Sequence, residues 1–165
     1  VWAWDEIVQM NKSGYWPYTP NTNLLDGLSE ALDMLLEQGL DAVFARHRQL
    51  AGAVHAAVQG WSEGGALSFF CQLPECRSHS VTAVAVRSGV DPEALRSVAR
   101  ERFQVSLSGG LGPLAGRVFR IGHMGDINAA MVLGALGGVE AALRAQGIPI
   151  GPGGVQRAID HLARH

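Results

Sequence analysis

The stretch RVFRIGHMGDIN, residues 117–128, indicates a strand that leads through a glycine turn into a helix. Residues 117–121 form a short apolar run around Arg120, which is typical of a strand, and a long helix is expected from about Asn128. The two glycines between them allow the backbone and a ligand to approach closely. A guanidinium binds an oxyanion through two hydrogen bonds, so Arg120 is a candidate clamp for a carboxylate or phosphate. The alternative is an edge-strand arginine that pairs with a neighbouring acid.

The apolar periodicity on both sides of this strand alternates between helical and strand spacing. Residues 1–23 are aromatic and rich in turn formers, and no helix is expected before the TPNTN run at residues 19–23, which ends in good helix-capping residues. The expected helices cover residues 23–38, 41–61, 92–102, 128–146 and 155–163, and the expected strands cover residues 66–71, 80–86, 103–107 and 117–121, with a loop over 108–116. This order predicts an α+β fold, in which helices are layered on one face of an antiparallel or mixed sheet and long helices precede it.

The composition limits the class of protein. The chain has 165 residues, 47% hydrophobic and 17% charged, enough for one globular core, although two small domains remain possible. Its net charge is -2 without any basic run, which argues against a nucleic-acid surface. No window is apolar enough for a membrane span, since even the smoothest stretch, residues 129–143, contains Glu140. No signal peptide is visible, and we expect a cytoplasmic protein.

Two further stretches could bind an anion. Thr19 lies just before the expected helix start and could present its hydroxyl and backbone N–H to a phosphate, although a plain N-terminal turn is the alternative. The glycine-rich turn at residues 109–112 could form an anion nest, although a tight connection between two strands explains it as well. Cys71 and Cys76 are expected to be reduced thiols, because a lone pair of cysteines is not a disulfide framework.

The histidines give weaker signals. We expect His47 to be solvated, and His55 lies near the same helical face without an obvious third metal ligand. His123 lies beside the candidate clamp and could hydrogen-bond a ligand, although a contact with the backbone is the more common role. No metal site is expected. Hydrolase chemistry has no support either, because we expect no nucleophile elbow and neither cysteine has an evident basic partner.

Two well-separated motifs resemble the class V aminotransferases, the pyridoxal-phosphate enzymes of fold type I. They are PYTPNTNLLDGLSEALDMLLEQGLDAVFARHRQLA, residues 17–51, and SLSGGLGPLAGRVFRIGHMGDIN, residues 106–128. The similarity runs from Trp4 to His161 and is strongest to the subgroup of serine–glyoxylate and alanine–glyoxylate aminotransferases, in their C-terminal part. The activity that the resemblance implies is transfer of an amino group from serine to glyoxylate, with alanine or a phosphonate amine as alternative donors.

The resemblance also implies roles for individual residues. Arg120 matches the arginine that binds the substrate α-carboxylate, and Thr19 matches a threonine that contacts the cofactor phosphate, typically across the interface of a homodimer. The family places a tyrosine three residues before that threonine, and this chain has Trp16 there with Tyr15 beside it. The lysine that forms a Schiff base with the cofactor is expected upstream of residue 1. Lys12, the one lysine of the chain, does not match it, so we expect no catalytic residue within these residues.

The resemblance divides the chain into two parts. Residues 1–38 correspond to a remnant of the large cofactor domain with a linking helix, and residues 39–165 to the small C-terminal domain. The implied partners are amino-acid and 2-oxo-acid substrates and a second subunit, with no nucleic acid and no membrane. A different hypothesis is a non-catalytic module that self-associates through exposed apolar residues: Leu24, Leu25, Trp2 and Trp4.

Overall fold

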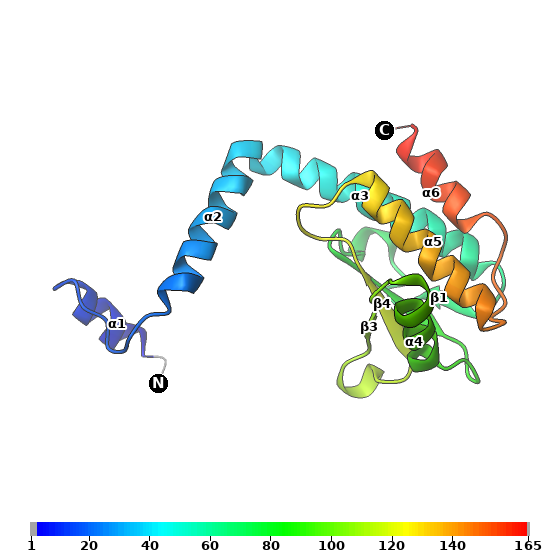
Figure 1. Cartoon of the computed structure of the whole chain (residues 1–165), viewed down its shortest axis with the longest axis horizontal. Helices are drawn as coiled ribbons and strands as arrows, with labels where there is room; N and C mark the ends of the chain where they lie inside the picture. The colour runs from blue at the N-terminus through cyan, green and yellow to red at the C-terminus, as the bar shows by residue number, and fades with distance from the viewer. Residues whose placement is uncertain (1–2, 165) are drawn as a thin grey trace. The chain divides into compact units, whose positions relative to one another are not determined.

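The chain forms two compact units that meet in sequence between Val43 and Phe44. The computed structural model describes residues 3–164, so Trp2, which was expected on an exposed apolar surface, lies outside the described residues. Figure 1 shows the elements of both units along the chain. No helix within residues 3–164 has the length and apolarity needed to cross a membrane.

The N-terminal unit contains helices α1 (Trp4–Asn11) and α2 (Thr22–Gln38). Helix α2 begins as expected, because Asn21 caps it by accepting a hydrogen bond from the amide of Leu24 at 3.1 Å. The expectation of no helix before the TPNTN run was wrong. Acidic side chains in the first turn of α1 complement the helix dipole there, a signal that its aromatic neighbours obscured.

The C-terminal unit contains a four-stranded antiparallel sheet in the order β1-β2-β4-β3. Its strands are β1 (Leu67–Phe69), β2 (Val81–Val86), β3 (Ser108–Gly109) and β4 (Val118–Gly122). The prediction of a strand over residues 103–107 was wrong. Helix α4 continues to Phe103, Gln104 ends it in a left-handed conformation with φ 58°, and pairing starts only at Ser108. The short 3-10 helices Pro74–Cys76 and Gly112–Leu114 were also not expected.

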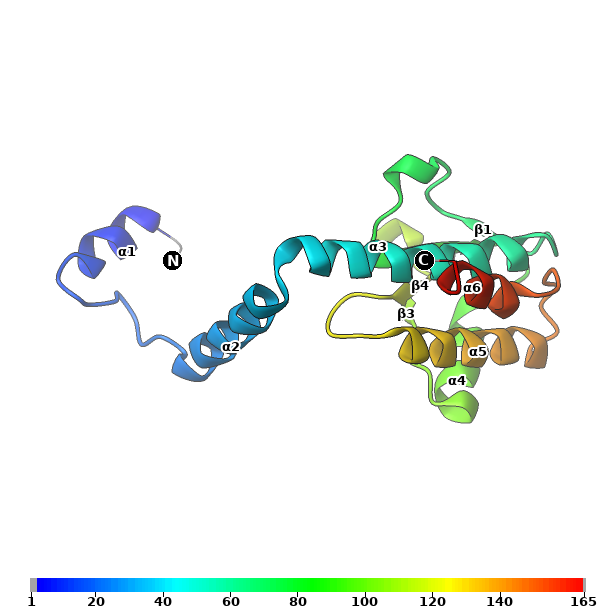
Figure 2. The same ribbon diagram turned by 90° about the horizontal axis from the view of Figure 1, so that it is seen from above.

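Helices cover one face of this sheet (Figures 1 and 2). These are α4 (Pro92–Phe103), α5 (Ala129–Ala145) and the part of α3 (Leu40–Ser62) that begins at Phe44 and belongs to this unit. Helix α6 (Gly154–Leu162) packs against α3 and α5. Helix α4 begins at residue 92 as expected, and Asp91 caps it: its carboxylate accepts from the amides of Glu93 and Ala94 at 2.8 and 3.3 Å. The arrangement confirms the predicted α+β fold with helices on one face of the sheet.

The two faces of the sheet have different environments. Side chains alternate between faces along a strand, and Phe119 and Ile121 of β4 enter the core together with Val84 of β2. Arg120, between the two core residues of β4, therefore projects from the face opposite the helices. Cys71 and Cys76 are free thiols in the segment between β1 and β2.

Candidate functional site

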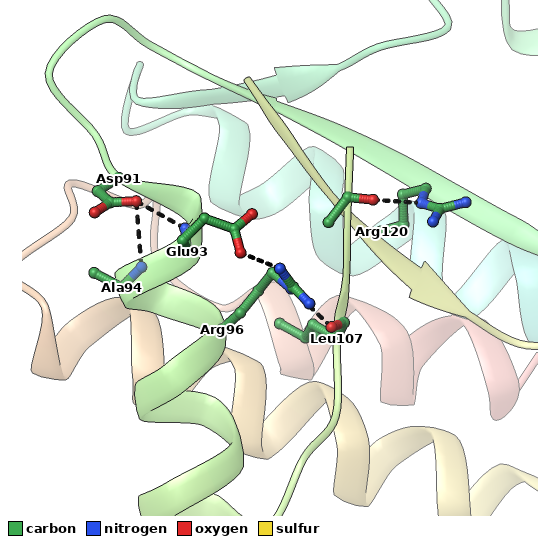
Figure 3. A network of polar contacts seen from close by, with 7 residues as sticks. Asp91, Glu93, Ala94, Arg96, Leu107 and Arg120 are labelled. Atoms are coloured by element: carbon green, nitrogen blue, oxygen red, sulfur yellow. Dashed lines mark hydrogen bonds and ion pairs between the residues drawn. The ribbon is translucent and has the colours of Figure 1, made fainter. Parts of the chain in front are cut away.

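Arg120 occupies an inner strand, between Ala83 of β2 and Ser108 of β3. Its side chain is half-buried, and its Nε–H donates a hydrogen bond to the carbonyl oxygen of Gly109 at 2.8 Å (Figure 3). This contact fixes the plane of the guanidinium group and leaves its outer edge, with both terminal nitrogens, facing away from Gly109. That edge presents the two parallel donors that a carboxylate accepts.

Arg120 has no acidic partner within residues 3–164. The ion pairs of this part of the chain join other residues, and the single hydrogen bond of the Arg120 side chain is the one to Gly109. The structure therefore contradicts the alternative of an edge-strand arginine paired with a neighbouring acid. A half-buried guanidinium without a counter-ion is suited to receiving an anion from outside the unit.

His123 follows Arg120 closely and is buried, with 1% of its surface exposed. Its Nδ1 lies 3.1 Å from the carbonyl oxygen of His79, which only accepts, so Nδ1 carries the proton. Its Nε2 then accepts from the hydroxyl of Thr82 at 2.8 Å. Burial lowers the pKa of His123, although hydrogen bonding to the backbone opposes this change. His123 thus has the backbone contact that the sequence favoured and serves as a neutral anchor.

The loop between β4 and α5 is fastened to α3. Arg46 Nη1 donates to the carbonyl oxygens of Gly125 at 2.7 Å and Ile127 at 3.2 Å. His47 Nε2 accepts from the amide of Gly125 at 3.1 Å. The expectation that His47 is solvated was therefore wrong. Its partner lies 78 residues away, and no local pattern could have indicated the contact.

His55 is a second imidazole of this region and is half-buried. Its ring makes edge contacts with Phe69 and His123, with centroids 5.8 and 6.2 Å apart, and its buried Nε2 has no hydrogen-bond partner in the described structure. Burial, reinforced by the neighbouring His123 and Arg77, lowers the pKa of His55 to about 4. Residues 3–164 contain no group of three or more side chains arranged to hold a metal ion.

The glycine-rich turn after β3 is a tight connection. The amide of Gly110 donates to the carbonyl oxygen of Val118 at 3.1 Å and is not available to an anion. A Cβ on Gly110 would lie 1.9 Å from the carbonyl oxygen of Leu114, so the backbone needs glycine at this position. This geometry supports the interpretation of residues 109–112 as a connection between strands rather than an anion nest.

The residues expected to contact a phosphate lie in the N-terminal unit, in the segment that joins α1 to α2. Tyr15 and Trp16 are 68% and 42% exposed, and the ring centroids of Trp16 and Tyr18 are 6.4 Å apart. Thr19 is exposed and lies two residues before Asn21, which caps α2. These three residues therefore share one segment, whereas Arg120 belongs to the other unit.

Comparisons with known proteins place the chain among aminotransferases, although no family model matches it. It is 42% identical to serine–glyoxylate aminotransferase of Arabidopsis thaliana over 98% of this chain and 40% of that protein. Identity to the enzyme of the same name from Hyphomicrobium methylovorum is 38% over 99% of this chain and 40% of that protein.

Solved structures give the same result. Pyridoxamine–pyruvate aminotransferase from Mesorhizobium loti matches with a TM-score of 0.83 and 35% identity, over 91% of this chain and 38% of that one. Ureidoglycine–glyoxylate aminotransferase from Bacillus subtilis matches with a TM-score of 0.77 and 31% identity, over 90% and 37%. The chain spans about 40% of the length of the curated relatives that it matches.

Proposed function

Since the chain belongs to the class V aminotransferases of fold type I, we propose that it is the C-terminal part of an enzyme that transfers an amino group from serine to glyoxylate. In this proposal residues 1–38 belong to the large cofactor domain with its linking helix, and residues 39–165 form the small domain. The protein would be a cytoplasmic homodimer that acts on amino acids and 2-oxo acids.

The guanidinium of Arg120 is the observation that carries this proposal. It lies on the open face of the sheet, has no acidic partner within residues 3–164, and is oriented through Nε by Gly109 at 2.8 Å. The terminal nitrogens would donate to the α-carboxylate, which the amino donor and the 2-oxo acid have in common. One fixed clamp would thus orient both substrates of the exchange.

Aminotransferases of this class depend on pyridoxal phosphate, which withdraws electrons from the reacting carbon while the amino group moves. The exposed donors of the N-terminal unit fit the phosphate end of this cofactor. Thr19 would donate its hydroxyl to the phosphate of the partner subunit's site, just before the amino end of α2, with Tyr15 and Trp16 beside it.

The lysine of the reaction is not assigned to this chain. Lys12 is exposed at the end of α1, and its Nζ hydrogen-bonds Gln9 at 3.5 Å. We propose that the Schiff-base lysine comes from residues outside those of this chain. The isolated chain, supplied with pyridoxal phosphate, serine and glyoxylate, should then form no glycine. Turnover that Lys12→Ala abolishes would contradict this assignment.

The clamp is tested in the intact enzyme that contains this chain. Arg120→Met should lower kcat/KM for serine at least about 100-fold, because a charge-assisted bidentate contact is lost, while the absorbance of the bound cofactor persists. Arg87→Met, on an exposed arginine of the same unit, is the control and should change kcat/KM less than about twofold. An unchanged KM for both serine and glyoxylate in Arg120→Met would refute the clamp. Alanine and a phosphonate amine, tested beside serine, identify the donor.

A second candidate function is a non-catalytic module that self-associates. It is favoured by the apolar stripe of α2, which has no buried residue and exposes Leu24, Leu25, Leu28, Leu32, Leu35 and Leu36. Sedimentation of the chain distinguishes the two. A dimer without affinity for pyridoxal phosphate would favour the module, whereas a monomer would count against it.

A further inference from the structure

We propose that the ion pair between Glu93 and Arg96 on α4 is a positioning device for Arg120, acting through the edge strand β3. The pair lies on the helix side of β3, and Arg120 lies on the opposite side (Figure 3). The kinetic experiment below measures substrate binding and therefore rests on the function proposed for Arg120, whereas the hydrogen-exchange experiment does not.

Gly109 links the two sides of the strand. Its carbonyl oxygen accepts the hydrogen bond from Arg120 Nε at 2.8 Å. On its other side, a Cβ built on Gly109 would lie 2.7 Å from Arg96 Nη1 and 2.9 Å from Glu93 Oε1. The ion pair thus packs directly against the Cα of the residue that orients Arg120, and the absence of a side chain at Gly109 permits this approach.

Arg96 also fixes the strand just before Gly109. Its Nε–H donates to the carbonyl oxygen of Leu107 at 2.9 Å, while its Nη1 contacts Glu93. Glu93 itself is held in the first turn of α4, where its amide donates to the Asp91 side chain. A planar guanidinium with two of its donors engaged has a single orientation, which a lysine at this position could not reproduce.

Strand β3 needs such support because it is very short. It consists of Ser108 and Gly109 at the edge of the sheet, paired on one side only, with Arg120 and Phe119. A two-residue edge strand has few ladder hydrogen bonds of its own and opens readily. Contacts from α4 are therefore needed to keep the Gly109 carbonyl in place, and with it the plane of the Arg120 guanidinium.

An exposed ion pair usually contributes little to global stability. The Arg96 and Glu93 side chains are 31% and 53% exposed, so loss of the pair should leave most of the fold intact. Its effect should be local, on β3 and on the Arg120 side chain. This separation between local order and global stability makes the proposal testable.

The first experiment uses this chain, labelled with ¹⁵N, and measures hydrogen exchange at the Nε–H of Arg120 by NMR. Arg96→Met should accelerate this exchange about tenfold or more relative to the wild type. Arg96→Lys, which keeps the charge but cannot replace both donors, should do the same if Arg96→Met does not fold. Arg100→Met is the control, because Arg100 lies on the same helix, is 69% exposed and pairs with Glu101. It should leave the exchange within about twofold.

Exchange within about twofold of wild type in folded Arg96→Met and Arg96→Lys overturns the proposal. Equal acceleration in Arg100→Met overturns it as well, because loss of positive charge on α4 would then explain the result. Acceleration in the two Arg96 variants alone supports it.

The second experiment measures steady-state kinetics of the intact enzyme. Arg96→Met should raise KM for serine and glyoxylate about fivefold to tenfold with kcat within about twofold, since a misoriented clamp weakens substrate binding. A merely structural role would lower kcat through loss of folded enzyme at unchanged KM, and that result overturns the proposal. If Arg120→Met itself leaves KM unchanged, the function proposed for Arg120 fails, while the exchange at its Nε–H still decides whether Arg96 positions it.

Discussion

The indole Nε1–H of Trp61 donates a hydrogen bond to Glu140 Oε2 at 2.9 Å and joins α3 to α5 inside the C-terminal unit. The same oxygen accepts from the amide of Val155 at 3.1 Å, at the start of α6. The other carboxylate oxygen, Oε1, accepts from Arg144 at 2.8 Å. Glu140, the one charge in an otherwise smooth apolar stretch of sequence, therefore links three helices.

The pH dependence of stability should reveal this role of Glu140. Burial raises the pKa of its carboxyl group, but hydrogen bonds from Trp61, Arg144 and Val155 outweigh that effect and hold the pKa below 4.5. A carboxylate with a depressed pKa stabilises the fold above its unfolded value, and this contribution is lost as the pH falls through the folded value. Wild type should therefore lose more stability below pH 4.5 than Glu140→Gln does. Urea unfolding at pH 7 and pH 3.5 measures the difference, and equal losses would contradict it.

The junction around Trp61 also requires glycine at position 154. A Cβ on Gly154 would lie 2.1 Å from Trp61 Nε1, so Gly154→Ala should displace the indole and weaken its bond to Glu140. We expect a loss of about 3 kcal/mol in the free energy of unfolding. Gly134→Ala is the matched control, because α5 leaves open space at that position, and it should stabilise by about 0.5–1 kcal/mol. Thermal unfolding of the two variants decides the matter, and similar Tm values would be evidence against a tight junction.

Protonation of His55 should lower the free energy of unfolding in a higher pH range than protonation of Glu140 does. The pKa of His55 is about 4 in the folded chain because of burial and the nearby His123 and Arg77, against 6.5 for the free side chain. The unfolded state thus binds more protons between these values, so the stabilising contribution is complete above pH 6.5 and is lost as the pH falls toward 4. His55→Leu should reduce this loss by about 1–2 kcal/mol, since the ring is partly exposed.

The same variant should be at least as stable as wild type at pH 7. His55→Leu removes a buried Nε2 that has no hydrogen-bond partner in the described structure, and such an atom costs free energy. Guanidinium unfolding at pH 7 and pH 4.5 measures both effects. A pH dependence in His55→Leu as steep as that of wild type would exclude His55 as its source.

Features with local causes were predictable from the sequence, and features with distant causes were not. Asn21 and Asp91 cap their helices through side chains next to the first turn, so local patterns were sufficient. Strand β3 was misplaced because its position depends on pairing with Phe119 and Arg120, not on its own two residues.

The candidate site follows the same rule. Arg120 was identified because the apolar run around it marks a strand on its own. The hydrogen bond from Arg120 to Gly109 and the one from Arg96 to Leu107 each join residues 11 positions apart, so no local pattern indicates them. The requirement for glycine at position 109 comes from the close approach of Arg96 and Glu93, which only the three-dimensional structure shows. The phosphate-side residues Thr19, Tyr15 and Trp16 stay predictions from resemblance, since geometry within their own unit does not test them.

The loop after β4 offers a last test, because its anchors on α3 are specific. The amide of Gly125 donates to His47 Nε2, and Arg46 holds the carbonyl oxygens of Gly125 and Ile127. His47→Phe removes the acceptor and should accelerate hydrogen exchange of the Gly125 amide about tenfold, whereas His47→Gln, which can still accept, should restore much of the protection. The exchange of buried Val84 in β2 should be unchanged in both variants, which separates local opening from global unfolding. Equal exchange at Gly125 in wild type and His47→Phe would mean that Arg46 alone holds the loop, and Arg46→Met should then produce the acceleration instead.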